Sequence, residues 1–263
     1  MKRQYRGIGV LAVIVLTIWL ALAGGVVAAP AGAVETGALR SFVVVDGKTG
    51  NDEQGEGTAL TPYRTIGHAL DRAKEGAVVV VLPGTYKESL SITRKVTLMS
   101  DPGRAYGVTR TVIDAAGLDE GIRIKGDGAA GTIIEGLTIQ HANNQGIFAE
   151  DTSDIIIRGN HVNNNAQAPT SDRIETKAIL LVGVSSSYVL DNTVTQNKGG
   201  GIAVTNNGPI NPGALVPGTP RPAMYNIISG NRVNDNEESC GIVVAAINPG
   251  QGVIGNLVTG NTV

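Results

Sequence analysis

The amino-acid sequence predicts a parallel β-solenoid with three short strands per coil. Two repeated patterns carry this prediction: a segment of the type Gly-Asn-x-Val, and a strand that begins with glycine or alanine and continues with alternating aliphatic residues. Once two insertions are removed, the patterns recur with a period in the low-to-middle twenties. Three strands at about 3.3 Å per residue, joined by tight bends, require a coil of that length.

Four segments define the first pattern, and asparagine recurs six positions after the start of each. The segments begin at Gly159, Asp191, Gly230 and Gly255, and the later asparagines are Asn165, Asn197, Asn236 and Asn261. An aliphatic column stands two residues before each segment, with Ile134 one coil earlier: Ile157, Val189, Ile228 and Val253. Bends leave backbone groups unpaired, and asparagines stacked at about 4.7–4.9 Å can bond both the backbone and each other.

One helix is expected, ahead of the repeats. Thr65 is a suitable N-cap, and Gly76 suits the C-terminal end. Between them an apolar face recurs at helical spacing through Ile66, Ala69, Leu70 and Ala73. The apolar run 77–82, ended by Pro83 and Gly84, predicts a strand that is buried on both faces.

Composition excludes several classes of protein. With 42% hydrophobic residues and one cysteine in 263 residues, the chain is too apolar for disorder and too poor in cysteine for a disulfide scaffold. We expect that cysteine, Cys240, to be a small buried residue. Without the three basic residues of the N-terminal segment, 18 basic residues face 23 acidic ones. No basic surplus is left for phosphates, so nucleic acid is excluded as a partner.

The N-terminal segment has the pattern of an export signal. Residues 1–6 are cationic, residues 7–34 carry no charge, and Ala31-Gly32-Ala33 fits a cleavage site. We therefore interpret residues 1–33 as a signal peptide, with an uncleaved membrane anchor as the alternative. Residues 34–263 then form one exported domain, with a cap over 41–84 and coils over 85–263. The protein is expected to be secreted or anchored at the cell surface, with membrane contact only if the segment stays uncleaved.

The start of this domain resembles the N-terminal cap and first coil of the right-handed parallel β-helix proteins of the pectin lyase-like superfamily. The resemblance rests on Phe42-Val43-Val44, Gly57-Thr58, Pro62-Tyr63-Arg64-Thr65-Ile66, Ala69-Leu70, Ala73, Gly76 and Pro83-Gly84-Thr85-Tyr86. It implies a right-handed β-helix whose open N-terminal end is plugged by the helix. The superfamily includes polysaccharide lyases, glycoside hydrolases, esterases, epimerases and non-catalytic surface proteins, so the fold does not choose an activity. The catalytic Asp and Arg motifs of the esterases and the Asp-Pro-His motif of the epimerases are absent from the sequence.

The strands of the Gly-Ile type form the sheet that holds the polysaccharide groove in the lyases of this superfamily. Two insertions, 166–176 and 207–222, flank this sheet and are expected to wall a groove from opposite sides. Residues that alternate with the buried aliphatics point outward: Arg123, Lys125, Phe148, Glu150, Leu180, Val182, Ala203, Thr205, Val243 and Ala245. For substrate binding we select Phe148 together with Asp172, Arg173 and Glu175 of the first insertion.

A calcium-dependent polyuronate lyase, which the resemblance makes one candidate, needs carboxylates for the metal and a basic side chain for the proton. The carboxylates available for Ca²⁺ are Glu150, Asp151 and Asp154. The catalytic candidates are Arg123, Lys125, Lys177 and Lys198. The alternative interpretation is that these are solvated turn charges of no chemical consequence.

Two functions therefore stand side by side. The first is an exported carbohydrate-active protein that binds an anionic polysaccharide and cleaves it by β-elimination, as a lyase, or as a glycoside hydrolase. The second is a non-catalytic β-helix that serves as a surface, adhesion or structural protein. The sequence stops within a fresh rung at Val263, so we expect either a truncated chain or a last coil that contacts a protein partner or protomer.

Overall fold

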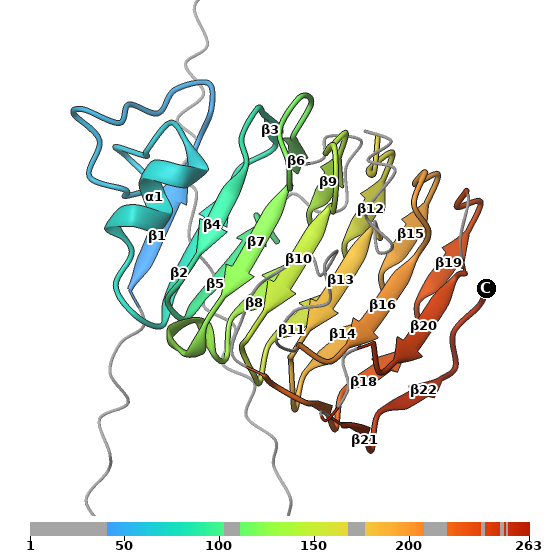
Figure 1. Cartoon of the computed structure of the whole chain (residues 1–263). Coiled ribbons are helices and arrows are strands. Elements are labelled where there is room, and N and C mark those ends of the chain that lie inside the picture. Colours follow the sequence, from blue (N-terminus) through green and yellow to red (C-terminus); the bar gives the residue numbers. More distant parts are fainter. Residues whose placement is uncertain are drawn as a thin grey trace, which may run out of the picture. The chain divides into compact units, whose positions relative to one another are not determined.

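A computed structural model shows the predicted right-handed parallel β-helix (Figure 1). It describes residues 41–102, 111–167, 177–207, 220–237, 240–247, 250 and 252–263. The predicted signal segment 1–33 lies outside these residues. Within the described part, short parallel strands form three long sheets, and successive coils contribute one strand to each. No helix of that part is long and apolar enough to cross a membrane.

We name the three sheets A, B and C. Sheet A is ordered β1 (Phe42–Val45), β2 (Ala77–Val81), β5 (Val96–Ser100), β8 (Ile133–Glu135), β11 (Ile156–Arg158), β14 (Tyr188–Leu190), β18 (Ile227–Ser229) and β22 (Leu257–Thr259). Sheet B contains β3 (Gly84–Tyr86), β6 (Thr111–Asp114), β9 (Thr138–Gln140), β12 (His161–Asn163), β15 (Thr193–Thr195) and β19 (Arg232–Asn234). Sheet C contains β4 (Leu90–Ile92), β7 (Ile122–Lys125), β10 (Ile147–Glu150), β13 (Ile179–Val182), β16 (Ile202–Thr205) and β20 (Ile242–Ala245). A 3-10 turn η1 (Asp127–Ala129) and the small pair β17 (Ala223–Met224) and β21 (Val253–Ile254) lie outside the three sheets.

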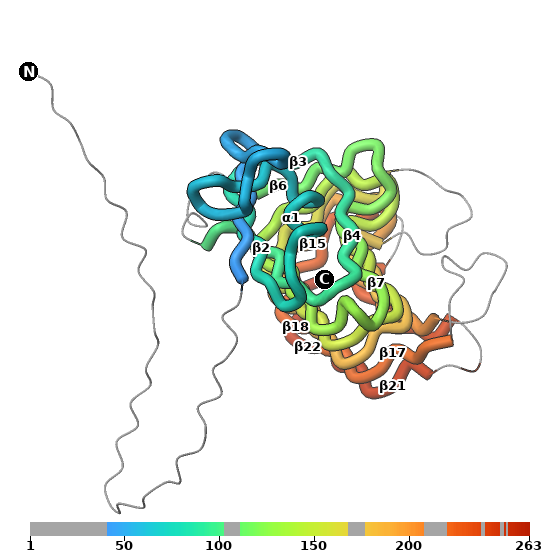
Figure 2. The backbone as a smooth tube through the Cα atoms, turned by 90° about the vertical axis from the view of Figure 1, so that its left-hand side faces the viewer, coloured from blue at the N-terminus to red at the C-terminus, as the bar shows by residue number. Residues whose placement is uncertain are grey.

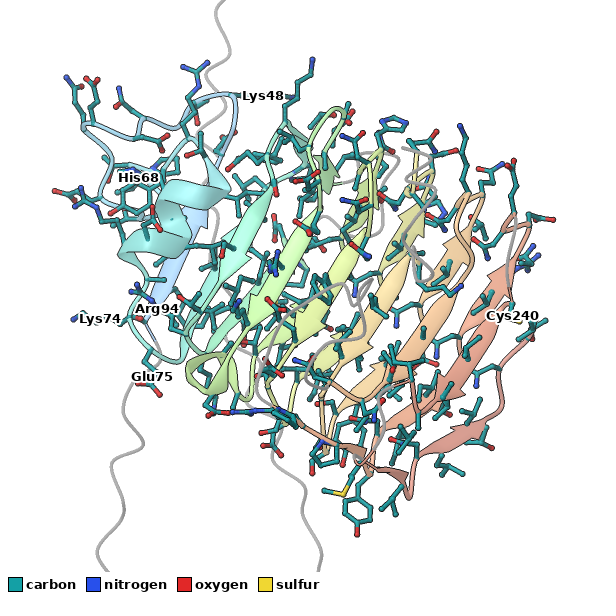
Figure 3. All side chains as sticks on the ribbon, viewed as in Figure 1. Lys48, His68, Lys74, Glu75, Arg94 and Cys240 are labelled. Atoms are coloured by element: carbon teal, nitrogen blue, oxygen red, sulfur yellow. The ribbon has the colours of Figure 1, made fainter. Side chains whose placement is uncertain are left out.

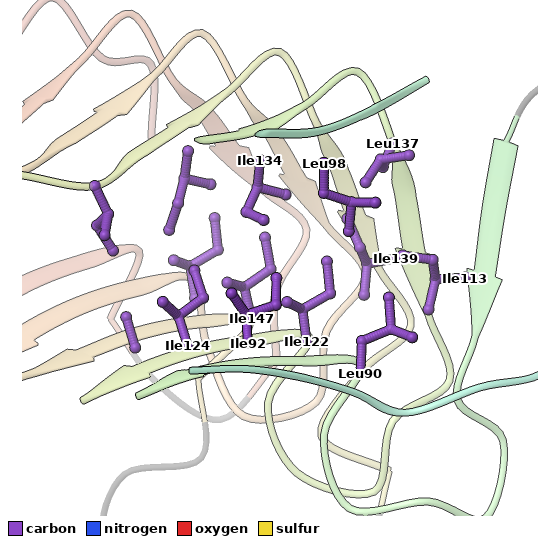
Figure 4. Packing of buried hydrophobic residues seen from close by; sticks show 14 of the residues in the cluster. Leu90, Ile92, Leu98, Ile113, Ile122, Ile124, Ile134, Leu137, Ile139 and Ile147 are labelled. Atoms are coloured by element: carbon purple, nitrogen blue, oxygen red, sulfur yellow. The ribbon is translucent and has the colours of Figure 1, made fainter. Parts of the chain in front are cut away.

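The core is a stack of aliphatic side chains inside the coils (Figure 4). Ile147, Ile179 and Ile202 occupy the same position on successive strands of sheet C, and each is wholly buried. Side chains of a strand alternate between its two faces, so this column fixes which residues point outward. The predicted inward and outward positions of sheet C are therefore confirmed.

Asparagine ladders hold the bends between sheets. At the bend from sheet A to sheet B, the Oδ1 atom of Asn192 accepts hydrogen bonds from the backbone and side-chain nitrogens of Asn160, at 2.9 and 3.1 Å. Its Nδ2 atom donates to the carbonyl of Ile157 and to Oδ1 of Asn231, each at 2.9 Å. A second ladder, with the same bonds between successive rungs, runs through Asn165, Asn197 and Asn236. Both predicted columns are thus confirmed over these coils.

The last coil departs from the predicted register. Val258, rather than Val253, pairs with Ile228 in sheet A, and Asn261 stacks on Asn231. Asn256 belongs instead to a third ladder, at the bend that enters sheet A, which runs through Ser187, Asn226 and Asn256. The predicted register was wrong because similar turns, of the Gly-Asn-x-Val type, occur at both bends of a coil, five residues apart. The motif alone therefore does not show to which of the two bends an asparagine belongs.

The helical cap is confirmed, although the helix α1 (Ile66–Arg72) ends before Gly76. The Thr65 side chain accepts from the backbone nitrogen of His68 at 3.4 Å, as an N-cap does. The carboxylate of Glu88 accepts one bond on each oxygen from the first two helical nitrogens, those of Ile66 and Gly67, at 2.9 and 2.8 Å. Seen along the coils, α1 lies across their N-terminal end (Figure 2).

The glycines that begin the strands of sheet C are required by close packing between coils. A Cβ atom at Gly201 would lie 2.1 Å from the carbonyl oxygen of Gly241 on the next coil, and one at Gly146 would lie 2.5 Å from Val162. The expectation for Cys240, which stands two residues before β20, is wrong: this residue is exposed at the last coils (Figure 3).

We expect the change Asn192→Ala to lower the free energy of unfolding by roughly 2–4 kcal/mol, because it leaves buried backbone and amide groups unpaired. Asn192 is only 1% exposed. The matched control is Asn234→Ala, because among the described residues the Asn234 side chain bonds only to neighbours on its own coil, Arg232 and Asp235. Denaturant unfolding of the two variants checks this, and equal losses would contradict a special role for the ladder.

Candidate functional site

The outward face of sheet C carries a second apolar cluster, separate from the core. It consists of Phe148, Leu180, Val182 and Ala203, with Val243 packed against it. None of the first four is more than 5% exposed. Phe148, Leu180 and Ala203 occupy matching positions on β10, β13 and β16, and Val182 lies two residues after Leu180 on the same face. The central coils thus bury an apolar surface on the side where the sequence places a groove.

A charged group lies beside this apolar surface on the first coils of the sheet. The Oε1 atom of Glu150 accepts from Nη2 and Nε of Arg123, at 2.6 and 2.9 Å, and lies 3.1 Å from Nζ of Lys125. The Nη1 atom of Arg123 is 3.5 Å from the carboxylate of Glu120. We call Glu120, Arg123, Lys125 and Glu150 the carboxylate cluster. It forms because β7 and β10 pair in register, which sets Glu150 directly beside Lys125.

Burial is unequal within the carboxylate cluster. The side chain of Glu150 is fully buried, whereas those of Arg123 and Lys125 are 32% and 52% exposed. The second oxygen of Glu150, Oε2, is buried and has no hydrogen-bond partner among the described residues. The guanidinium of Arg123 also lies over the ring of Phe148, 5.0 Å from its centroid. A buried anion therefore holds two cations whose outer surfaces face solvent.

A second group of polar side chains lies at the base of the second insertion. It consists of Asp127, Asp151, Asn207 and Arg221, and we call it the insertion clamp. Asn207 and Arg221 form an antiparallel bridge, with backbone bonds of 2.9 and 3.0 Å. Arg221 donates to both carboxylate oxygens of Asp127, at 2.7 and 2.9 Å, and to the carbonyl of Asp151 at 3.1 Å. The Arg221 guanidinium holds the pKa of Asp127 below its ordinary value. This bridge ties the insertion to two earlier coils.

Each of the three predicted calcium ligands interacts with a different polar or charged side chain. Glu150 faces the two cations, Oδ1 of Asp151 accepts from Asn207 at 2.9 Å, and the exposed Asp154 accepts from Ser153 at 2.6 Å. No three carboxylate, histidine or cysteine side chains of the described ranges gather as a metal-binding group. A calcium site at these residues stays a prediction.

The four catalytic candidates divide into two pairs at opposite ends of the strands. Lys177 precedes β13, whereas Glu150 pairs with Val182 at the end of that strand. The five residues from Lys177 to Val182 correspond to about 16 Å of extended chain. Lys177 is buried and its Nζ atom donates to the carbonyl of Gly199 at 3.3 Å. Lys198 is exposed in the same bend region. Arg123 and Lys125, by contrast, belong to the carboxylate cluster.

Three predicted substrate-binding residues, Asp172, Arg173 and Glu175, lie outside the described residues, so only Phe148 can be placed. The sequence analysis missed Glu120 and the insertion clamp. Glu120 ends a turn just before β7, and Arg221 is far in sequence from Asp127, so no local spacing connects these residues.

A family model described as a protein of unknown function, DUF1565, matches residues 48–263. No curated protein sequence matches. Among solved structures, an alginate lyase from Paenibacillus sp. strain FPU-7 is 18% identical with a TM-score of 0.49. The match covers 74% of this chain and 72% of the enzyme. The pectate lyase Pel9A is 11% identical with a TM-score of 0.44, covering 85% of this chain and 77% of the enzyme. A pectin methylesterase from carrot is 13% identical with a TM-score of 0.41, covering 80% of this chain and 66% of the enzyme.

The change Glu150→Gln should destabilise the fold more than Glu135→Gln. Both carboxylates bond to an arginine across two coils, but Glu150 is fully buried and Glu135 is 32% exposed. Removing the buried anion leaves two cations without their shared partner, and we expect a loss of about 2–3 kcal/mol, discounted for the exposure of those cations. The exposed pair should lose less than about 1 kcal/mol. Equal unfolding free energies for the two variants, measured in denaturant, would show that the carboxylate cluster has no special stability.

Proposed function

Because the chain belongs to the DUF1565 family of β-helix proteins of unknown function, we propose its function from its own site: an exported, carbohydrate-active protein that binds an anionic polysaccharide across the outward face of sheet C. The observation that carries the proposal is the carboxylate cluster, in which a buried Glu150 fixes two partly exposed cations. Export rests on the signal pattern of residues 1–33.

The cluster suits recognition of sugar carboxylates. Arg123 and Lys125 stand two residues apart on one face of β7, about 6.6 Å along the strand. The planar fork of an arginine binds a carboxylate through two parallel hydrogen bonds, and lysine adds a compact positive charge. Glu150 orients the Nε and Nη2 edge of Arg123 inward, and Nη1 faces Glu120. Neighbouring uronate residues of a chain would meet cations that are already held in place.

Cleavage by β-elimination requires a base that removes the proton next to the uronate carboxyl group, after which the glycosidic bond breaks and an unsaturated end remains. Arg123 and Lys125 suit binding better than this step, because both are already held by the carboxylate of Glu150. Lys177 and Lys198 are then the candidates for the base, at the other end of the strands. Ca²⁺, if used, would neutralise the uronate carboxylate, with Asp151 and Asp154 supplying oxygen ligands.

A non-catalytic surface protein is the second candidate. Glu150 engages both Arg123 and Lys125 within the chain, which is also what a purely structural charge network does. Such a protein would bind no soluble polyuronate through this face and would produce no unsaturated sugar.

We expect Arg123→Ala and Lys125→Ala each to weaken polyuronate binding by about tenfold, as loss of one charge-assisted contact implies. Arg232→Ala is the matched control, because Arg232 is an exposed arginine on the outward face of sheet B. Calorimetric titration with polygalacturonate and alginate measures binding, and absorbance of unsaturated ends, with calcium and then with a chelator, measures cleavage.

Three results separate the candidates. Binding that falls only in the two sheet C variants, together with calcium-dependent product, supports a lyase. Binding without product supports a carbohydrate-binding protein whose chemistry is not elimination. No binding by the folded wild-type protein overturns the proposal and favours the non-catalytic alternative.

A further inference from the structure

The face of sheet A that points away from the core carries apolar side chains on each of its eight strands except β5 in one of its columns. Inward positions of this sheet, such as Leu98, Ile134 and Ile157, belong to the core, so their neighbours in sequence point outward. One outward column passes through every strand in register. We call it the sheet A stripe; its members are Phe42, Val78, Thr97, Ile133, Ile156, Tyr188, Ile227 and Leu257.

Much of the stripe is accessible to solvent. Phe42, Tyr188 and Leu257 are 66%, 40% and 50% exposed, and Ile133 and Ile156 at the centre are half-buried. Eight strands spaced at about 4.8 Å extend over about 34 Å. Single exposed apolar residues are ordinary on a protein surface, but a contiguous row of this length indicates an interaction site.

A second outward column runs parallel to the stripe, two residues further along each strand. It consists of Val44, Val80, Met99, Glu135, Arg158, Leu190, Ser229 and Thr259. Its only charged members, Glu135 and Arg158, are adjacent, with Nη2 of Arg158 2.7 Å from Oε2 of Glu135. They stand on β8 and β11, the two central strands of the sheet. The face therefore carries one pair of opposite charges at its midpoint, and its other members are apolar except for Thr97, Ser229 and Thr259.

We propose that this face binds a second copy of the same chain in a two-fold symmetric dimer. A two-fold axis that runs parallel to the strands, between β8 and β11, reverses the strand order and keeps each column opposite itself. It sets Ile133 against Ile156 of the second copy, and Glu135 against Arg158 of the second copy. Both charges then meet their opposite across the interface, and the stripe packs on itself over its whole length.

The position of Glu135 and Arg158 favours a second copy of the chain as the partner, and it favours the axis parallel to the strands. An axis along the coils, midway between the two columns, would instead set the Glu135–Arg158 pair against the apolar stripe, which would bury both charges with no opposite charge across the interface. A lipid surface or a neutral polymer would gain nothing from one acidic and one basic group at the centre of the face. Self-complementary charges on a symmetric apolar face are what an isologous interface requires.

Sedimentation analysis of the protein purified from cells that express the whole chain tests the proposal. We expect a dimer whose fraction rises with concentration. Arg158→Glu and Glu135→Arg should each give monomers, because like charges then meet at the axis, and the double exchange should restore the dimer. Ile156→Lys should also give monomers. Arg232→Glu, which makes the same charge change on sheet B, should leave the dimer intact.

Folding is followed by circular dichroism, because the single exchanges also remove the pair within one chain, which as an exposed pair contributes little to stability. Three outcomes overturn the proposal: a wild-type protein that is monomeric at every concentration, a dimer that persists in all the sheet A variants, or a double exchange that stays monomeric. A wild-type monomer that sediments with phosphatidylcholine vesicles or with an insoluble polysaccharide would assign the face to that partner instead. These results do not depend on polyuronate binding by sheet C.

Discussion

The structure depends on the register with which each coil stacks on the previous one. Parallel pairing at about 4.8 Å sets every residue beside its counterpart on the next coil, and the asparagine ladders fix the bends so that this register does not slip. Asn192, for example, ties its rung to Asn160 on one side and Asn231 on the other. The same register sets Glu150 beside Lys125 and carries one column, apolar except for Thr97, across all of sheet A. The core, the carboxylate cluster and the sheet A stripe therefore share a single geometric cause.

Most of the fold could be predicted from sequence because stacking repeats the same residue type in each column. Asparagines and buried aliphatics mark their columns directly, and alternation along Ile147–Glu150 correctly separates the residues that face the core from those that point outward. The last coil was misplaced because Asn256 and Asn261 occupy similar turns at different bends. The site was less predictable, since non-repeating residues have no column to mark them. Neither the pairing of Glu150 with Arg123 nor that of Arg221 with Asp127 follows from local spacing.

The three faces of the solenoid differ because their bends differ. In the later coils the bend from sheet A to sheet B is short and filled by the ladder of Asn160, Asn192, Asn231 and Asn261, whereas ten residues separate β5 from β6 at this bend in an early coil. Both insertions instead interrupt the path into or out of sheet C. Long segments beside a rigid sheet can supply polar groups from several coils, as the insertion clamp does with Asp127, Asp151 and Arg221. Sheet A, without insertions beside its central strands, keeps a regular and apolar face.

The proposed dimer contact lies on sheet A and the carboxylate cluster lies on sheet C, and this separation affects how the protein would bind a polymer. A two-fold contact through sheet A leaves both copies of sheet C outside the interface, so Arg123 and Lys125 of each copy stay open to solvent. Binding of a long anionic chain at one cluster would then raise the effective concentration of that chain, or of its neighbours in a matrix, at the other. Two weak sites can in this way hold a polysaccharide far more tightly than one. A monomer with a single cluster, whose cations are partly neutralised by Glu150, would have no such gain.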